Sequence, residues 1–356
     1  MSRLYPAQEE PSEKQPDGSM PDPKLAHVRE QWKYSSPLIA CSFDPGGKYV
    51  FASAEDNSVQ RWNLESSAIT PFAAHDSWVR DMTFLADGQT LVTVGSDDQM
   101  IWWPVAAENP KPLKTIQAHK GWIRTVSISP DGTLLATGGN DNLVKIWNTT
   151  VGTCLHELAG HDSNVYSTLF HPEGQFLVSG DLSGQVRQWE ISSGKFVRAF
   201  DASALHTYNG GQQVHYGGVR SIALSPDLKY MACSGLHKAT NPLGAVSEPL
   251  VLLFDWESQE LLRSHVTSDV RGIGWSVYYL ADGTLMGLSG GGGGGFLLFW
   301  KPDEDKDFFK FKLPNIARDL ALHPNGLQVA TTHFDRHLRI SHMTPKPPEK
   351  EDKKSG

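Results

Sequence analysis

The sequence has few cysteines and no long apolar run. Cys41, Cys154 and Cys233 are the only cysteines among 356 residues, each lies in an apolar, strand-like run, and none belongs to a CxxC pair. This pattern is typical of small buried thiols in a reducing compartment. No segment approaches 18 consecutive apolar residues, and the N-terminal MSRLYPAQEEPSEKQPDG lacks the apolar core of a secretory signal. We therefore expect a cytoplasmic protein without a membrane span.

Positive charge is not in excess either. The chain has 32 Lys and Arg against 40 Asp and Glu, which gives a formal net charge of −8. This balance argues against a general affinity for nucleic acid or for anionic membranes. His333, His337 and His342 lie near the last predicted hairpin, but no acidic or thiolate residue has a spacing typical of a metal site. We expect neither a metal nor a cofactor.

Helical periodicity is nearly absent, and an internal repeat is present in its place. Three stretches align without a gap, and in each of them a His precedes a Thr or Ser by 18 residues and a Trp by 28 residues. The aligned residues, with an Asp before the Trp in the first two stretches, are His75, Thr93, Asp97 and Trp103; His119, Thr137, Asp141 and Trp147; and His161, Ser179 and Trp189. Such fixed spacing of chemically distinct residues indicates a repeated structural unit.

Each unit alternates apolar and polar residues and is divided by turns such as Pro130-Asp131-Gly132 and Asn140-Asp141-Asn142. Period-two alternation between hairpin turns predicts four antiparallel strands per unit. Four weaker copies end at Trp62, at Trp256, at Trp300 and near Ser341, which brings the total to seven. The prediction is an all-β fold of seven four-stranded antiparallel sheets.

The units resemble those of the WD40 family, the fold of the G-protein β subunit. GNDNLVKIWN and GSDDQMIWW approximate the Asp-x-x-x-Val-x-x-Trp ending of that family. The resemblance covers about residues 28–343 and implies a seven-bladed β-propeller. It also implies that the aligned His, Thr or Ser, Asp and Trp residues form structural hydrogen-bond tetrads, which satisfy buried polar groups together. The fourth unit has Ser183 where Asp is expected, and the first has Tyr34 and Ala52 at the His and Ser positions.

The ends of the chain require a special arrangement. Proline and charge after Ile340 disfavour a further strand, so the last blade lacks an outer strand of its own. HVREQWKY at residues 27–34 alternates in the required way, and we expect it to pair with the last blade and close the ring. The expected organisation is a disordered tail at 1–24, a propeller at 25–343 and a disordered charged tail at 344–356.

An arginine recurs near the start of the first strand in five of the seven units. The family resemblance places this position at the mouth of the central channel, on the top face of the propeller. The recurring residues are Arg80, Arg124, Arg220, Arg271 and Arg318, with Ile39 and Tyr166 at the same position in units one and four. Trp78 and Trp122 precede two of the arginines by two residues and are expected to flank them.

Two interpretations of the arginines remain open. Converging guanidinium groups favour an anionic partner such as an acidic or phosphorylated peptide, with the tryptophans and Tyr166 as apolar anchors. Alternatively, the arginines pair with acids of neighbouring blades, because Asp81 and Asp319 are adjacent in sequence, and Asp97 and Asp141 are further candidates. Two enlarged loops, at 201–218 and 237–248, and the glycine run at 290–295 flank Arg220 and Arg271, and long loops often carry recognition.

The predicted function is a non-enzymatic scaffold that binds proteins or acidic peptides at its top face, as a monomeric propeller within larger complexes. One alternative is a propeller enzyme of the hydrolase or lyase type that uses the channel. Gly287-Leu288-Ser289-Gly290-Gly291 satisfies GxSxG, but a strand follows it where a nucleophile elbow needs a helix. The other alternative is an assembly subunit that binds through the rim.

Overall fold

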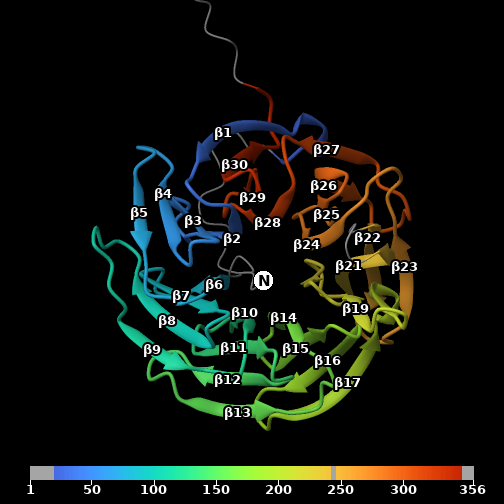
Figure 1. The fold of residues 1–356 in the computed structure, drawn as a ribbon. Coiled ribbons are helices and arrows are strands. Elements are labelled where there is room, and N and C mark those ends of the chain that lie inside the picture. Colours follow the sequence, from blue (N-terminus) through green and yellow to red (C-terminus); the bar gives the residue numbers. More distant parts are fainter. Residues whose placement is uncertain (1–19, 242–245, 347–356) are drawn as a thin grey trace, which may run out of the picture.

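The computed structural model describes residues 20–241 and 246–346. Seven four-stranded antiparallel sheets are arranged around a common axis like the blades of a propeller (Figure 1). The described residues contain no α-helix, only two 3₁₀ turns, η1 (Pro23–Leu25) and η2 (Ser203–Leu205). The predicted all-β, seven-bladed propeller is therefore confirmed.

In each of the first three blades the strands follow one another from the channel to the rim, because short turns join sequential strands. Blade 1 contains β2 (Leu38–Phe43), β3 (Tyr49–Ala54), β4 (Val59–Asn63) and β5 (Ile69–Phe72); blade 2 contains β6 (Val79–Phe84), β7 (Thr90–Gly95), β8 (Gln99–Pro104) and β9 (Lys114–Gln117); and blade 3 contains β10 (Ile123–Ile128), β11 (Leu134–Gly139), β12 (Val144–Asn148) and β13 (Cys154–Leu158).

The next three blades repeat this order. Blade 4 contains β14 (Val165–Phe170), β15 (Phe176–Asp181), β16 (Gln185–Glu190) and β17 (Lys195–Asp201); blade 5 contains β20 (Ser221–Leu224), β21 (Tyr230–Asn241), β22 (Val246–Asp255) and β23 (Leu261–His265); and blade 6 contains β24 (Ile273–Tyr279), β25 (Leu285–Gly291), β26 (Gly294–Trp300) and β27 (Phe309–Leu313).

Blade 7 draws its outermost strand from the beginning of the chain. Its sheet runs β1 (His27–Lys33), β30 (His337–His342), β29 (Gln328–His333) and β28 (Ala317–Leu322). Val28 lies opposite Ser341 and Trp32 opposite Leu338 in an antiparallel register. The expected strand at 27–34 thus lies beside β30.

The described part of the predicted N-terminal tail is attached to blade 7. The Asp22 N–H donates to the Met343 carbonyl at 2.8 Å, and the Asp22 side chain caps η1. Asp22, which the sequence prediction placed in the tail, is therefore hydrogen-bonded to blade 7. The rest of that tail, 1–19, and residues 347–356 of the predicted C-terminal tail lie outside the described residues.

The apolar core lies between neighbouring blades. Phe51 and Phe72 of blade 1 meet Phe84 and Trp103 of blade 2 edge to face, with ring centroids 5.3–5.6 Å apart. Similar clusters of fully buried side chains join the other blades. Burial of apolar surface on both faces of each sheet, at about 25 cal/mol per Å², holds the ring rigid and fixes the position of the channel-facing residues.

Backbones approach closely between blades 6 and 7. A Cβ added to Gly290 would lie 1.8 Å from the Ala317 carbonyl oxygen, whereas a Cβ added to Gly292 meets nothing within 4 Å. We predict that Gly290→Ala lowers the free energy of unfolding by about 1–3 kcal/mol, because the strands must move apart. Gly292→Ala, in the same turn, should change it by less than about 0.5 kcal/mol. Urea unfolding of both variants tests this, and equal losses would contradict the close approach.

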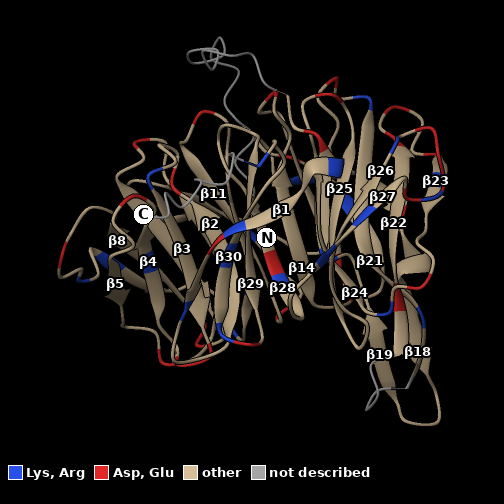
Figure 2. Cartoon of the chain, turned by 90° about the horizontal axis from the view of Figure 1, so that it is seen from above, with Lys and Arg blue, Asp and Glu red and all other residues tan. Residues whose placement is uncertain are grey.

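Two hairpins extend from blade 5 at the end of the blade where β20 starts. β18 (His206–Asn209) and β19 (Val214–Gly217) form a separate two-stranded sheet within the enlarged segment 201–218, and Figure 2 shows it projecting from the propeller. β21 and β22 continue past the blade into the enlarged segment 237–248. The Ser247 hydroxyl donates to the Gly272 carbonyl at 2.9 Å, and the Gly272 N–H donates to the Ser247 carbonyl at 2.8 Å. The predicted loops are therefore largely β-hairpins fixed to the ring.

Candidate functional site

A β-bulge near the start of the innermost strand sets the position of the recurring side chain. In blades 2, 3, 4, 6 and 7 the register shifts by one residue at this point, so one residue is left out of the pairing. The unpaired residues are Arg80, Arg124, Tyr166, Trp275 and Arg318. Bulges of this kind redirect a side chain, and in this propeller they place a large polar or aromatic group at the same point of each of these blades.

These side chains stack on one another in an alternating series. The Arg80 guanidinium carbon lies 4.9 Å from the Trp78 ring centroid and 4.8 Å from that of Trp122. The Arg124 guanidinium lies 5.3 Å from Trp122 and 4.4 Å from Tyr166. We call this series, with its continuation into blades 5 and 6, the arginine–aromatic ladder; its members are Trp78, Arg80, Trp122, Arg124, Tyr166, Arg220 and Trp275.

The ladder continues through Arg220, whose guanidinium lies 4.2 Å from the Tyr166 ring and 5.5 Å from the Trp275 ring. Cation–π contacts of this kind contribute about 0.5–2 kcal/mol each. Because each guanidinium lies against two aromatic rings, the ladder holds three positive charges in a fixed row. Trp78 and Trp122 remain 38% and 42% exposed, so apolar surface is accessible beside the charges.

The positive charges of the ladder are not compensated. Burial, together with the nearby guanidiniums of Arg124 and Arg318, lowers the pKa of Arg80 to about 10. Burial also lowers the pKa of Arg124 and of Arg220, while the Tyr166 side chain acts in the opposite direction. Burial and like charges act together in this way where a counter-charge is lacking.

The alternative of internal ion pairs holds for one arginine. The Arg318 Nη1 atom lies 2.6 Å from Glu55 Oε1, an acid of blade 1 that the sequence did not single out. Asp319 instead accepts the Cys41 N–H, and Asp81 accepts the Val126 N–H, so both carboxylates link neighbouring blades. In the described part of the chain, no acidic side chain lies within ion-pair distance of Arg80, Arg124 or Arg220.

The sequence prediction that Arg271 belongs to the arginine series is corrected by the structure. Arg271 precedes β24, is exposed and contacts none of the ladder rings within the described structure. Trp275, and not Arg271, occupies the bulge position of blade 6. Trp275-Ser276-Val277 corresponds to Arg220-Ser221-Ile222, because each motif has a hydroxyl residue and then an apolar residue. This short motif was the signal in the sequence from which Trp275 could have been identified.

The three predicted tetrads contain the expected His, Thr or Ser, and Trp residues in contact. His75 Nε2 lies 2.8 Å from Thr93 Oγ1, and the Trp103 indole donates to the same hydroxyl at 2.9 Å. His75 Nδ1 lies 2.9 Å from Asp97 Oδ2. The set His119, Thr137, Asp141 and Trp147 repeats these contacts at 2.7–2.8 Å. Although burial opposes the shift, the His75 hydrogen bond lowers the pKa of Asp97, and that of His119 lowers the pKa of Asp141.

The acid of the third tetrad is Asp181 and not the residue at position 183. His161 Nδ1 lies 2.8 Å from Asp181 Oδ2, and His161 Nε2 lies 2.7 Å from Ser179 Oγ, which also accepts the Trp189 indole N–H. Ser183 instead donates its hydroxyl to Asp181 at 2.7 Å. The expectation of an incomplete tetrad in blade 4 was therefore wrong.

Blade 1 departs from the tetrad as the sequence indicates. Ala52 offers no hydroxyl, and the buried Trp62 indole N–H has no partner among the residues described. Tyr34 donates its hydroxyl to Asp56 at 2.9 Å. The structural tetrads thus belong to blades 2, 3 and 4.

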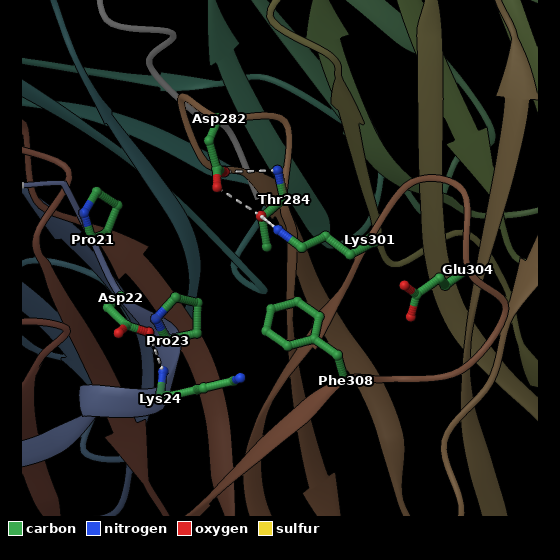
Figure 3. Close-up of a pocket in the computed structure, with 9 residues that line it drawn as sticks. All are labelled: Pro21, Asp22, Pro23, Lys24, Asp282, Thr284, Lys301, Glu304 and Phe308. Atoms are coloured by element: carbon green, nitrogen blue, oxygen red, sulfur yellow. Dashed lines mark hydrogen bonds between the residues drawn. The ribbon is translucent and has the colours of Figure 1, made fainter.

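The other candidate sites have little support. Ser289 lies within β25, opposite Gly274, and is completely buried, so it is not at a strand–turn–helix elbow. No group of three or more potential metal ligands occurs in residues 20–241 and 246–346. A pocket of about 470 Å³ lies between η1 and the loops of blade 6 (Figure 3). Its Lys301 ammonium already contacts Thr284 at 3.3 Å and the Phe308 ring at 5.1 Å.

The model of the WD40 family, described as WD domain, G-beta repeat, matches residues 28–63, 66–103, 110–148 and 152–190. These four segments correspond to the repeats of the first four blades, and the fold supplies seven blades. The chain therefore carries WD40 repeats and folds as a seven-bladed β-propeller. None of the described helices of this WD40 protein is long and apolar enough to cross a membrane.

Several curated proteins are similar to this WD40 protein over part of its length. It is 29% identical over 230 residues to apoptotic protease-activating factor 1 of Rattus norvegicus, which covers 64% of this chain and 18% of that protein. It is 28% identical over 185 residues to nuclear distribution protein PAC1 of Arthroderma benhamiae, with 46% and 40% covered. It is 24% identical to periodic tryptophan protein 2 of Arabidopsis thaliana, with 60% and 23% covered. The chain thus spans less than half of each relative.

Proposed function

We propose that this WD40 protein is a non-enzymatic scaffold that binds an acidic or phosphorylated segment of a partner protein at its top face, on the arginine–aromatic ladder. The observation that carries the proposal is the row of three stacked guanidiniums without counter-charge. Arginine recognises carboxylate and phosphate through its paired N–H groups, and tryptophan and arginine dominate the energetic centres of protein interfaces.

The architecture of the site supports protein binding over catalysis. A channel-centred hydrolase or lyase would need convergent acids, a metal or an activated nucleophile. The acids near the ladder are occupied: Asp81 and Asp319 accept backbone N–H groups, and Glu55 pairs with Arg318. The rim remains the second candidate for an interface, because exposed apolar residues such as Leu155, Phe196 and Leu261 lie on or beside the outermost strands.

The proposal predicts that reversal of two ladder charges abolishes partner capture. In the double variant Arg80→Glu/Arg124→Glu, proteins captured from a lysate of the source organism by the wild type should be lost by at least about tenfold, because attraction becomes repulsion. Quantitative mass spectrometry of affinity-purified complexes measures this.

Arg271→Glu is the matched control, because Arg271 is an exposed arginine close to the top face but outside the ladder. It should retain the wild-type partners, and both variants should melt within a few degrees of the wild type. Retention of all partners by the double variant would refute the top-face site and favour the rim.

A further inference from the structure

One carboxylate already occupies the end of the arginine series. Glu55 directly follows β3 of blade 1. Its Oε1 lies 2.6 Å from Arg318 Nη1, and its backbone carbonyl accepts the Trp78 indole N–H at 3.1 Å. Arg318 in turn lies 4.9 Å from the Phe334 ring. A side-chain carboxylate therefore binds a guanidinium that is stacked on an aromatic ring. The neighbouring Arg80, Arg124 and Arg220 have no such carboxylate partner among the described residues.

The first two guanidiniums of the ladder are held by their Nε atoms. Arg80 Nε donates to Ser96 Oγ at 2.7 Å, and Arg124 Nε donates to Asn140 Oδ1 at 2.6 Å. The terminal Nη atoms of both residues have no hydrogen-bond partner within residues 20–241 and 246–346. Since the faces of each guanidinium contact aromatic rings, the Nη groups are the donors left for a ligand. A pair of Nη groups suits a carboxylate.

The shared rings limit the spacing of the positive charges. Arg80 and Arg124 lie 4.8 and 5.3 Å from the centroid of Trp122, so their guanidinium carbons are at most about 10 Å apart. Arg124 and Arg220 lie 4.4 and 4.2 Å from the centroid of Tyr166, so they are at most about 9 Å apart. In an extended peptide, side chains on one face recur about every 6.5–7 Å, at every second residue.

We propose that the ladder binds an extended peptide segment that carries carboxylates on alternate residues, one each for Arg80, Arg124 and Arg220. The rings of Trp122 and Tyr166 lie between these carboxylates, so the intervening residues of the peptide need not be charged. Adjacent carboxylates would point to opposite faces of an extended chain, so only part of a contiguous acidic run could reach the guanidiniums. This inference rests on the proposed top-face function and specifies its ligand.

Fluorescence anisotropy with labelled synthetic peptides tests the spacing. One peptide carries three glutamates that alternate with serines, a second has the same composition with contiguous glutamates, and a third replaces the alternating glutamates with phosphoserines. At a salt concentration of roughly 0.15 M, where exposed charges are screened, the alternating glutamate peptide should bind the full-length protein at least about tenfold more tightly than its contiguous isomer. Arg124→Glu should abolish this binding, and Arg271→Glu should leave it unchanged.

The outcomes separate the ligand from the function. Equal binding of the two glutamate peptides, both weakened by Arg124→Glu, would overturn the alternating spacing and leave the top-face site in place. Binding of the phosphoserine peptide alone would overturn the carboxylate assignment. If no peptide binds while Arg80→Glu/Arg124→Glu still loses its captured partners, the ladder recognises a different chemistry. Peptide binding that Arg124→Glu does not alter would contradict both proposals.

Discussion

Replacement of Asp181 with alanine should lower the free energy of unfolding by about 3–5 kcal/mol. The variant leaves Nδ1–H of the His161 side chain, which is completely buried, without an acceptor, and it removes the partner of the Ser183 hydroxyl. The His161 and Ser183 hydrogen bonds lower the pKa of Asp181 although burial opposes them, so its stabilising effect is present above the ordinary Asp pKa and is lost as the pH falls below it. Urea unfolding near neutral pH measures the loss.

Ser183 provides the control, because the repeat alignment places the acid at its position. Ser183→Ala removes one hydrogen bond of a partly exposed residue and should lower the free energy of unfolding by about 1 kcal/mol. The double variant Asp181→Gly/Ser183→Asp gives blade 4 the arrangement of blades 2 and 3, and it should recover most of the stability that Asp181→Ala loses. If Ser183→Ala proves as damaging as Asp181→Ala, our assignment of the tetrad acid is incorrect.

The different position of the acid in blade 4 explains why the repeat alignment missed Asp181. Blades 2 and 3 have Gly95 and Gly139 at the position equivalent to Asp181, and a Cβ there would lie 2.9 Å from His75 Nδ1 or 2.7 Å from His119 Nδ1. The space beside the imidazole therefore admits one carboxylate, either from the turn or from the strand end. A search at fixed spacing considers only the turn position, which is Ser183 in blade 4. The replacement of the equivalent glycine by Asp181 was the signal that the acid had moved to the end of the strand.

Local pattern predicted the blades well, because hairpin turns and period-two alternation act over a few residues. It also located Arg80, Arg124, Arg220 and Arg318, since each precedes a hydroxyl or acidic residue in the first strand. It could not locate Glu55, because its partner Arg318 lies 263 positions away and the two meet through closure of the ring. Trp275 was missed for another reason: the search followed one residue type, whereas the bulge accepts any large side chain.

The enlarged segments also differ from the sequence prediction in a physically simple way. Gly210 and Gly211 lie between β18 and β19, where glycine favours a tight turn, and the flanking residues pair in register from His206 opposite Gly217 to Asn209 opposite Val214. His215 contacts Tyr208 and His206, with ring centroids 4.6 and 5.1 Å apart. Aromatic cross-strand pairs stabilise a hairpin, so these side chains stabilise a β-hairpin where the sequence predicted a loop.

A second large effect concerns the buried carboxylate of Asp319, which joins blade 7 to blades 1 and 6. It accepts the Cys41 N–H and the Ser276 hydroxyl, both at 3.0 Å. Burial raises the pKa of Asp319 to about 6, because the charged form has lost its water. The pKa of Asp319 in the folded state thus lies above the value of about 3.9 for the unfolded chain. Protonated Asp319 therefore contributes to stability at low pH, and this contribution is lost as the pH rises through about 6.

The gain in the free energy of unfolding of Asp319→Asn over the wild type should therefore be larger at pH 7.5 than at pH 4.5, by about 2 kcal/mol. The amide oxygen can still accept the Cys41 N–H, and the amide nitrogen can donate to Ser276, so the inter-blade link persists without the buried charge. Buried His333 acts in the opposite direction, because burial lowers its pKa to about 4, so its contribution is lost as the pH falls. The difference between variant and wild type at each pH removes this common contribution.

Ser276→Ala should change the pH dependence of the free energy of unfolding in the opposite direction to Asp319→Asn. Loss of the hydroxyl donor raises the pKa of Asp319 further, so the free energy of unfolding should decline more steeply between pH 4.5 and 7.5 than in the wild type. Urea unfolding at several pH values compares the three proteins. A stability difference between Asp319→Asn and the wild type that does not depend on pH would show that this carboxylate keeps an ordinary pKa.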